Sequence, residues 1–117
     1  MTVYQGGCHC GAIAFELDAD IAEGYDCNCS MCRKRGGLLG FFPREALVLK
    51  TPESALGTYR FNKHAIEHRF CLLCGISPFS EGVDPRSGAK TAAVNLRCLP
   101  ALDLSSLRVV PVDGASF

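Results

Sequence analysis

The sequence lacks several features by which large classes of proteins are recognised. Tryptophan is absent, histidine occurs only 3 times, and no apolar run approaches the roughly 18–20 residues that cross a bilayer. The 12 basic and 12 acidic residues cancel to a formal charge of +0, which supports neither a basic nucleic-acid surface nor a polybasic membrane tether. The first residues, 1–7, lack the basic and apolar regions of a secretory signal. We therefore expect a cytoplasmic protein with neither nucleic acid nor membrane as a partner.

Cysteine, by contrast, is abundant, with 8 among 117 residues. In a reducing compartment, crowded thiols usually hold metal rather than form disulfides. The spacing agrees, because a single residue separates the cysteines in Cys8-His9-Cys10 and in Cys27-Asn28-Cys29. Pairs this close are unusual in a disulfide framework, so metal binding is the better interpretation of the cysteines.

The chain length and the apolar pattern predict one all-β domain over residues 1–117. Hydrophobic residues make up 48% of the chain and charged residues 21%, as in a globular protein. Apolar and other residues alternate from Ala12 to Leu17, which is typical of a half-buried strand. Turn signals separate the expected short antiparallel strands, at 12–17, 38–42, 46–49, 58–61, 67–70, 77–81, 91–96 and 108–112. Only Ser30–Lys34 and Leu102–Leu107 are expected to form a helical turn or two.

Two cysteine pairs predict a structural metal site. Cys71 and Cys74 are two residues apart and are followed by Gly75, the spacing of a zinc knuckle, in which a positive φ turns backbone amides toward the thiolates. A closed tetrahedral site needs four ligands, and Cys8 with Cys10 is the natural second pair. The alternative is a set of unliganded cysteines acting as small hydrophobic residues.

Cys27, Cys29 and Cys32 form a second group within one short stretch. Three protein ligands with an open fourth position are the arrangement of catalytic zinc. Arg33 follows directly and begins the basic run 33–35. This run either offsets the charge of the thiolates, attracts substrate carboxylates or is a solvated surface run. A fourth ligand from Cys98 or a histidine would make this second site structural as well.

Two further residues have open roles at this point. Cys98 is either a buried packing residue, a fourth zinc ligand or a nucleophile activated by Arg97. His68 lies on the expected strand that enters the zinc knuckle, where it acts as an acid–base group or is a satisfied structural histidine. Of the other histidines, His9 is expected to point away from the first metal and His64 to lie in a surface loop.

Four motifs in chain order resemble the glutathione-dependent formaldehyde-activating family. They are Gly7-Cys8-His9-Cys10-Gly11-Ala12-Ile13-Ala14-Phe15-Glu16, Cys27-Asn28-Cys29-Ser30-Met31-Cys32-Arg33, His68-Arg69-Phe70-Cys71-Leu72-Leu73-Cys74-Gly75-Ile76-Ser77-Pro78-Phe79, and Val94-Asn95-Leu96-Arg97-Cys98-Leu99. The resemblance implies a β-tent fold, as in methionine-R-sulfoxide reductases. It also implies a structural zinc on Cys8, Cys10, Cys71 and Cys74, and a second, labile zinc on Cys27, Cys29 and Cys32 that is associated with glutathione.

The activity implied by the resemblance is that of a carbon–sulfur lyase, an S-(hydroxymethyl)glutathione synthase that condenses formaldehyde with a thiol such as glutathione. Cys27, Cys29, Cys32 and His68 are then the expected catalytic residues, and Arg33 the expected binding residue. The alternative is a non-catalytic zinc scaffold that binds a protein partner through apolar segments such as 38–42. A third hypothesis is a redox enzyme based on Cys98, which requires an exposed thiol of low pKa.

Overall fold

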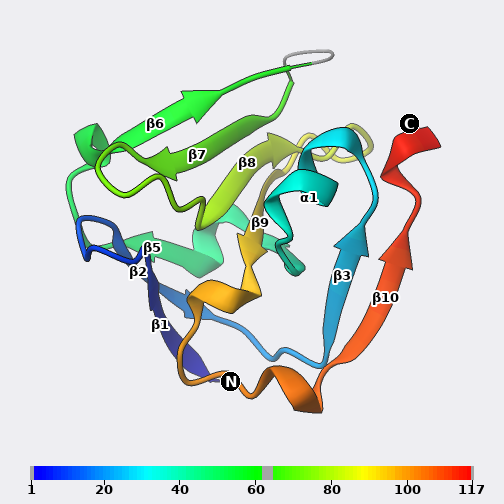
Figure 1. Cartoon of the computed structure of the whole chain (residues 1–117), viewed down its shortest axis with the longest axis horizontal. Helices are drawn as coiled ribbons and strands as arrows, with labels where there is room; N and C mark the ends of the chain where they lie inside the picture. The colour runs from blue at the N-terminus through cyan, green and yellow to red at the C-terminus, as the bar shows by residue number, and fades with distance from the viewer. Residues whose placement is uncertain (1, 62–64, 117) are drawn as a thin grey trace.

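The computed structural model describes residues 2–61 and 65–116, and most of its regular structure is strand (Figure 1). One sheet has the order β1-β2-β5, and a seven-stranded sheet has the order β10-β3-β4-β9-β8-β7-β6. The strands are β1 (Val3–Gly7), β2 (Ala14–Asp18), β3 (Glu23–Cys27), β4 (Leu39–Pro43), β5 (Leu47–Leu49), β6 (Leu56–Tyr59), β7 (Glu67–Cys71), β8 (Phe79–Val83), β9 (Lys90–Asn95) and β10 (Arg108–Val112).

The hydrophobic core joins the two sheets. Phe15 and Leu17 alternate with the less buried Glu16 along β2, so one face of that strand is apolar. The Phe15 ring meets Phe79 of β8 edge-on at 5.9 Å between centroids. Such an aromatic pair contributes about 0.5–1.5 kcal/mol beyond the area that it buries. This contact fixes the sheet that carries the first cysteine pair against the sheet that carries the other cysteine groups.

A short helix, α1 (Ser30–Arg35), lies between β3 and β4 and presents the middle cysteines. It begins at Cys29, whose sulfur accepts a hydrogen bond from the amide of Cys32 at 3.3 Å. It ends at Gly36, whose φ of +71° is a left-handed conformation that favours glycine. Basic residues fill its last turn, where they complement the helix dipole. The chain thus turns sharply at Cys29 and brings Cys32 back toward Cys27.

The all-β class is confirmed, and so is the helical turn expected at residues 30–34. Residues 102–107 contain a short 3-10 turn at Leu104–Ser106. Residues 38–42 belong mostly to β4, within the larger sheet, although the Phe41 side chain is 55% exposed. His64 lies outside the described residues. Among those that are described, no helix is long and apolar enough to cross a bilayer.

Two strands and one pairing were not predicted. β1 and β3 each contain glycine, which weakens a strand pattern. In β3 the reason is a close approach, because a Cβ at Gly24 would lie 2.6 Å from Leu38 Cγ. The expectation that the strands are antiparallel needs one correction, since β10 pairs with β3 in parallel. This pairing carries the C-terminal residues to the end of β3, beside Cys27.

Candidate metal centres

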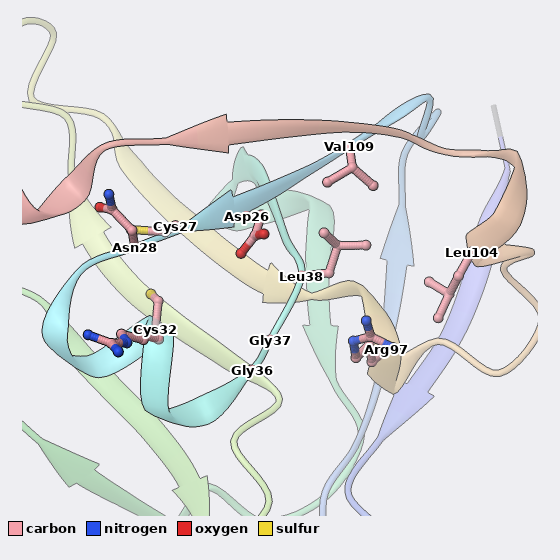
Figure 2. Close-up of a pocket in the computed structure, with 11 residues that line it drawn as sticks. Asp26, Cys27, Asn28, Cys32, Gly36, Gly37, Leu38, Arg97, Leu104 and Val109 are labelled. Atoms are coloured by element: carbon pink, nitrogen blue, oxygen red, sulfur yellow. The ribbon is translucent and has the colours of Figure 1, made fainter.

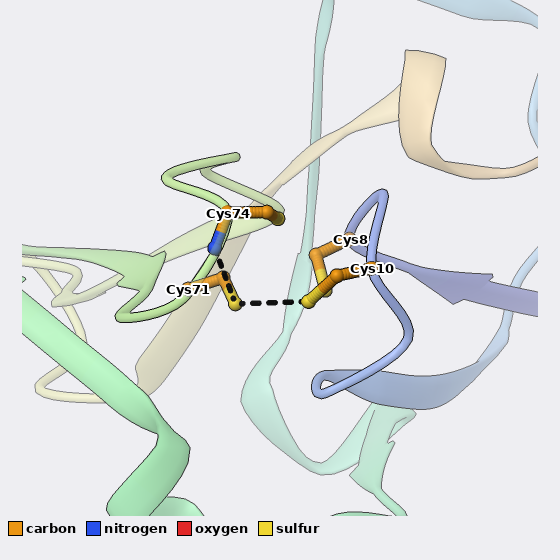
Figure 3. A group of neighbouring side chains, drawn as sticks. All are labelled: Cys8, Cys10, Cys71 and Cys74. Carbon is orange, nitrogen blue, oxygen red and sulfur yellow. Dashed lines mark hydrogen bonds between the residues drawn. The ribbon is translucent and has the colours of Figure 1, made fainter.

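The structure brings together Cys8 and Cys10 from the loop after β1, Cys71 at the end of β7, and Cys74 in the turn that follows (Figure 3). Their four sulfur atoms all lie within 4.8 Å of one another. The Cys8–Cys10 and Cys10–Cys71 sulfur distances are 3.7 and 3.6 Å. Zinc–sulfur bonds of about 2.3 Å in a tetrahedron place sulfurs about 3.8 Å apart. The group therefore fits a zinc ion of the closed, structural kind.

Backbone amides surround the sulfurs of this four-cysteine group. The amide of Ile13 donates to Cys8 Sγ at 3.3 Å, and those of Leu73 and Cys74 donate to Cys71 Sγ at 3.4 Å each. The turns that aim these amides pass through Gly11 and Gly75, with φ of +88° and +81°. Hydrogen bonds from amides stabilise the thiolate over the thiol, which is the form that binds metal.

In this group, ionisation of one thiol makes ionisation of its neighbours less favourable. The amide of Ile76, followed by that of Cys10, lowers the pKa of Cys74 to about 6. The amide of Ala12 acts in the same direction on Cys10, but burial and the neighbouring Cys71 and Cys8 thiols outweigh it and raise the pKa of Cys10 to about 11. Four thiolates cannot form this close together unless a cation compensates their charge, so the donor set itself calls for a metal ion.

Cys27, Cys29 and Cys32 form a second group at the end of β3 and the start of α1. Their sulfurs also lie within 4.8 Å of one another, and all three residues are half-buried. Burial, followed by the Cys29 thiol, raises the pKa of Cys32 to about 12. Burial also acts against ionisation of Cys29, but the amide and thiol of Cys32 outweigh it, and the pKa of Cys29 is lowered. This three-cysteine group also fits zinc, with fewer protein ligands than a closed site.

A pocket of about 540 Å³ adjoins the three-cysteine group (Figure 2). Cys27 and Cys32 lie at one end of it, and Arg97 lies toward the other. Its charged lining consists of Arg33, Arg97 and Asp26. Arg33 was expected at the site, whereas Asp26 and Arg97 were not. Arg97 was considered only beside Cys98. It lies in the 3-10 turn Leu96–Cys98 after β9, and a single sequence does not show that this turn reaches a pocket lined mainly by residues 26–38.

His68 lies outside the lining of this pocket. Its ring stacks on Phe61 at 5.2 Å between centroids, and Nδ1 is 3.0 Å from the Ser80 hydroxyl. Burial, followed by the positive charge of Arg35, lowers the pKa of His68. Burial lowers the pKa of Arg35, and the charges of Cys32 and Cys29 oppose that shift. Arg35 therefore connects His68 electrostatically with the three-cysteine group.

Cys98 belongs to the surroundings of the four-cysteine group. Burial, followed by the charges of Cys8 and Cys74, raises the pKa of Cys98 to about 11. A thiol of that pKa is almost entirely protonated at neutral pH, which argues against an activated nucleophile. Cys8 and Cys74, whose charges act on Cys98, belong to the four-cysteine group. This argues against the alternative in which Cys98 is the fourth ligand of the three-cysteine group. His9 is exposed.

Fold and site together define a small all-β protein with two cysteine groups that could bind zinc. A sequence model of the glutathione-dependent formaldehyde-activating enzyme family matches residues 3–107. The chain belongs to this family. It is also similar to a Rhodobacter sphaeroides protein of known crystal structure, at 30% identity and a TM-score of 0.77, over 92% of this chain and 97% of that one.

Proposed function

We propose that this chain is a carbon–sulfur lyase that joins glutathione, or a closely related thiol, to formaldehyde. In this reaction the thiol sulfur forms a bond to the carbonyl carbon, and the carbonyl π bond breaks. The sulfur loses one proton and the oxygen gains one, so the product is an S-hydroxymethyl thiol and nothing else is released. The observation that carries the proposal is the pocket that leads to Cys27 and Cys32.

The charges of the pocket suit glutathione. That tripeptide carries two carboxylates and one ammonium group at neutral pH, and the pocket offers two guanidinium groups, from Arg33 and Arg97, and one carboxylate, from Asp26. The volume of about 540 Å³ lies within the roughly 300–1,000 Å³ typical of small-molecule sites. A thiol placed at the cysteine end would extend its charged groups along the pocket.

Cys27, Cys29 and Cys32 would hold the zinc ion of this site, while the four-cysteine group would hold a structural zinc ion. A zinc ion with three protein ligands supplies Lewis acidity that lowers the pKa of a thiol or water at its remaining position. The chain's own contribution is orientation, because the amide of Cys32 fixes the Cys29 sulfur and Arg33 and Arg97 fix the substrate.

We propose Arg97 as a determinant of thiol specificity. Replacing Arg97 with glutamine removes one charge-assisted contact, so KM for glutathione should rise about tenfold or more. KM for 2-mercaptoethanol, which has no carboxylate, should hardly change. Steady-state kinetics with both thiols measures the effect, and Arg86→Gln, on an exposed turn, is the matched control. Equal losses with both thiols would show that Arg97 does not bind a carboxylate of the substrate.

We propose that His68, which does not line the pocket, moves the proton from sulfur toward oxygen through a water molecule between its ring and the substrate. Its pKa lies below the usual 6.5, so the ring is neutral at pH 7 and becomes protonated only as pH falls through that lower value. Turnover should therefore persist below pH 6.5 and then decline. His68→Gln should reduce kcat by about 10²-fold or more and abolish this decline. A variant with the unchanged pH profile of kcat would assign His68 a structural role.

A further inference from the structure

The C-terminal segment Asp113–Ser116 lies against the three-cysteine group, although it is about 85 residues away in sequence. The parallel pairing of β10 with β3 ends at Val112 opposite Cys27, and the chain then continues past that cysteine. Figure 1 shows this last turn beside the end of β3. The family match ends at residue 107, so the segment lies beyond the part of the chain that the match describes.

Asn28, between two of the cysteines, makes two hydrogen bonds to this segment and one to Val112, the residue before it. Its amide donates to the carbonyl of Val112 at 3.0 Å. Its side-chain Nδ2 donates to Asp113 Oδ1 at 3.0 Å, and its Oδ1 accepts from the amide of Ala115 at 2.9 Å. The nitrogen and the oxygen of the Asn28 side-chain amide are thus both hydrogen-bonded, to the Asp113 carboxylate and to the Ala115 backbone amide.

Gly114 packs directly against Cys27 and Cys29. A Cβ built at this position would lie 2.5 Å from Cys27 Sγ and 3.2 Å from Cys29 Cβ. Its φ is outside the left-handed region, so glycine is required by the close approach and not by the backbone conformation. Any larger side chain would have to displace either the segment or the Cys27 sulfur.

We propose that Asp113–Ser116 is a built-in wall of the three-cysteine site, in which Asn28 and Gly114 act as positioning residues that hold Cys27 and Cys29 ready to bind metal. The segment contacts Cys27 from outside the pocket, since none of its residues lines that pocket. It therefore confines the approach of a thiol to the side where Arg33 and Arg97 lie. This inference rests on the proposed function for the identity of the thiol, but not for the positioning of the sulfurs.

The test compares the unmodified chain with Gly114→Ala, Asn28→Ala and Asn28→Asp. Zinc affinity of each is measured by competition with a chromophoric chelator, and the four-cysteine group serves as an internal control. Loss of an outer partner of a metal ligand typically weakens metal binding by about 10–100-fold, and we expect this at the three-cysteine group alone. Asn28→Asp keeps the acceptor for Ala115 but replaces the donor to Asp113 with a second carboxylate, so it should lose at least as much as Asn28→Ala. Gly82→Ala, where a Cβ would meet only Ile66 at 3.7 Å, is the matched control.

A second measurement requires no metal at the three-cysteine group. In protein that retains only the zinc ion of the four-cysteine group, Cys27 should react with iodoacetamide faster in Gly114→Ala and in a chain truncated after Val112 than in the unmodified chain, as followed by peptide mass spectrometry. Unchanged zinc affinity and unchanged Cys27 labelling in these variants would overturn the proposal that Asp113–Ser116 forms a wall of the three-cysteine site. Failure of the lyase proposal would look different, because the variants would still show the altered labelling while the unmodified protein showed no turnover.

Discussion

Cys71→Ser is expected to abolish the folded state at ordinary temperature. Cys71 is 1% exposed, its sulfur accepts two backbone hydrogen bonds, and it joins β7 to the loop after β1. In a domain of this size the free energy of binding a structural zinc ion is largely folding free energy, on the order of 10 kcal/mol. The loss of one ligand should remove most of it. Far-UV circular dichroism, thermal unfolding and zinc content of the purified variant measure the effect.

Cys98→Ser is the matched control for this prediction. It changes the same atom in a half-buried residue beside the four-cysteine group, but outside the set of ligands. We expect both zinc ions to remain and the free energy of unfolding to change by about 1 kcal/mol or less. A Cys71→Ser protein as stable and as rich in zinc as Cys98→Ser would refute the structural role of the four-cysteine group.

Cys29→Ser should have the opposite character, leaving the fold intact and removing the activity. Cys29 is half-buried, and serine can still cap α1 because its hydroxyl accepts a hydrogen bond as the sulfur does. One zinc ion should be lost, and turnover of glutathione with formaldehyde should fall about 10³-fold, since a metal ion supplies several kcal/mol to such a reaction. The comparison is made at equal protein concentration against the spontaneous reaction of the two compounds.

Two results would contradict this expectation in different ways. Undiminished turnover in Cys29→Ser would place the chemistry elsewhere in the chain. An unmodified protein that holds both zinc ions but does not accelerate the reaction would favour the non-catalytic zinc scaffold over the lyase.

The sequence predicted the parts of the site that depend on short spacings. Cys71 and Cys74 meet because a two-residue spacer and Gly75 set a local turn, and the alternation from Ala12 to Leu17 marks β2 because one face of that strand is buried. Such signals lie within a few residues of one another, so one sequence contains them entirely.

The parts that escaped prediction depend on pairings between distant segments. Gly24 weakens the pattern of β3 for a reason that appears only once Leu38 is packed against it. The contacts of Asn28 with the C-terminal segment depend on the register of β10 against β3, which no local pattern specifies. Arg97 follows β9, and it reaches the pocket through the pairing of β9 with β4.

The central claim is that the two cysteine groups are two zinc sites with different roles, and native mass spectrometry tests it most directly. The protein is purified without added metal, and its intact mass is recorded before and after addition of glutathione. We predict two zinc ions on the unmodified chain, one of them absent from Cys29→Ser, and a glutathione complex only where the second zinc ion is present. A single zinc ion, retained by Cys29→Ser and indifferent to glutathione, would contradict the account.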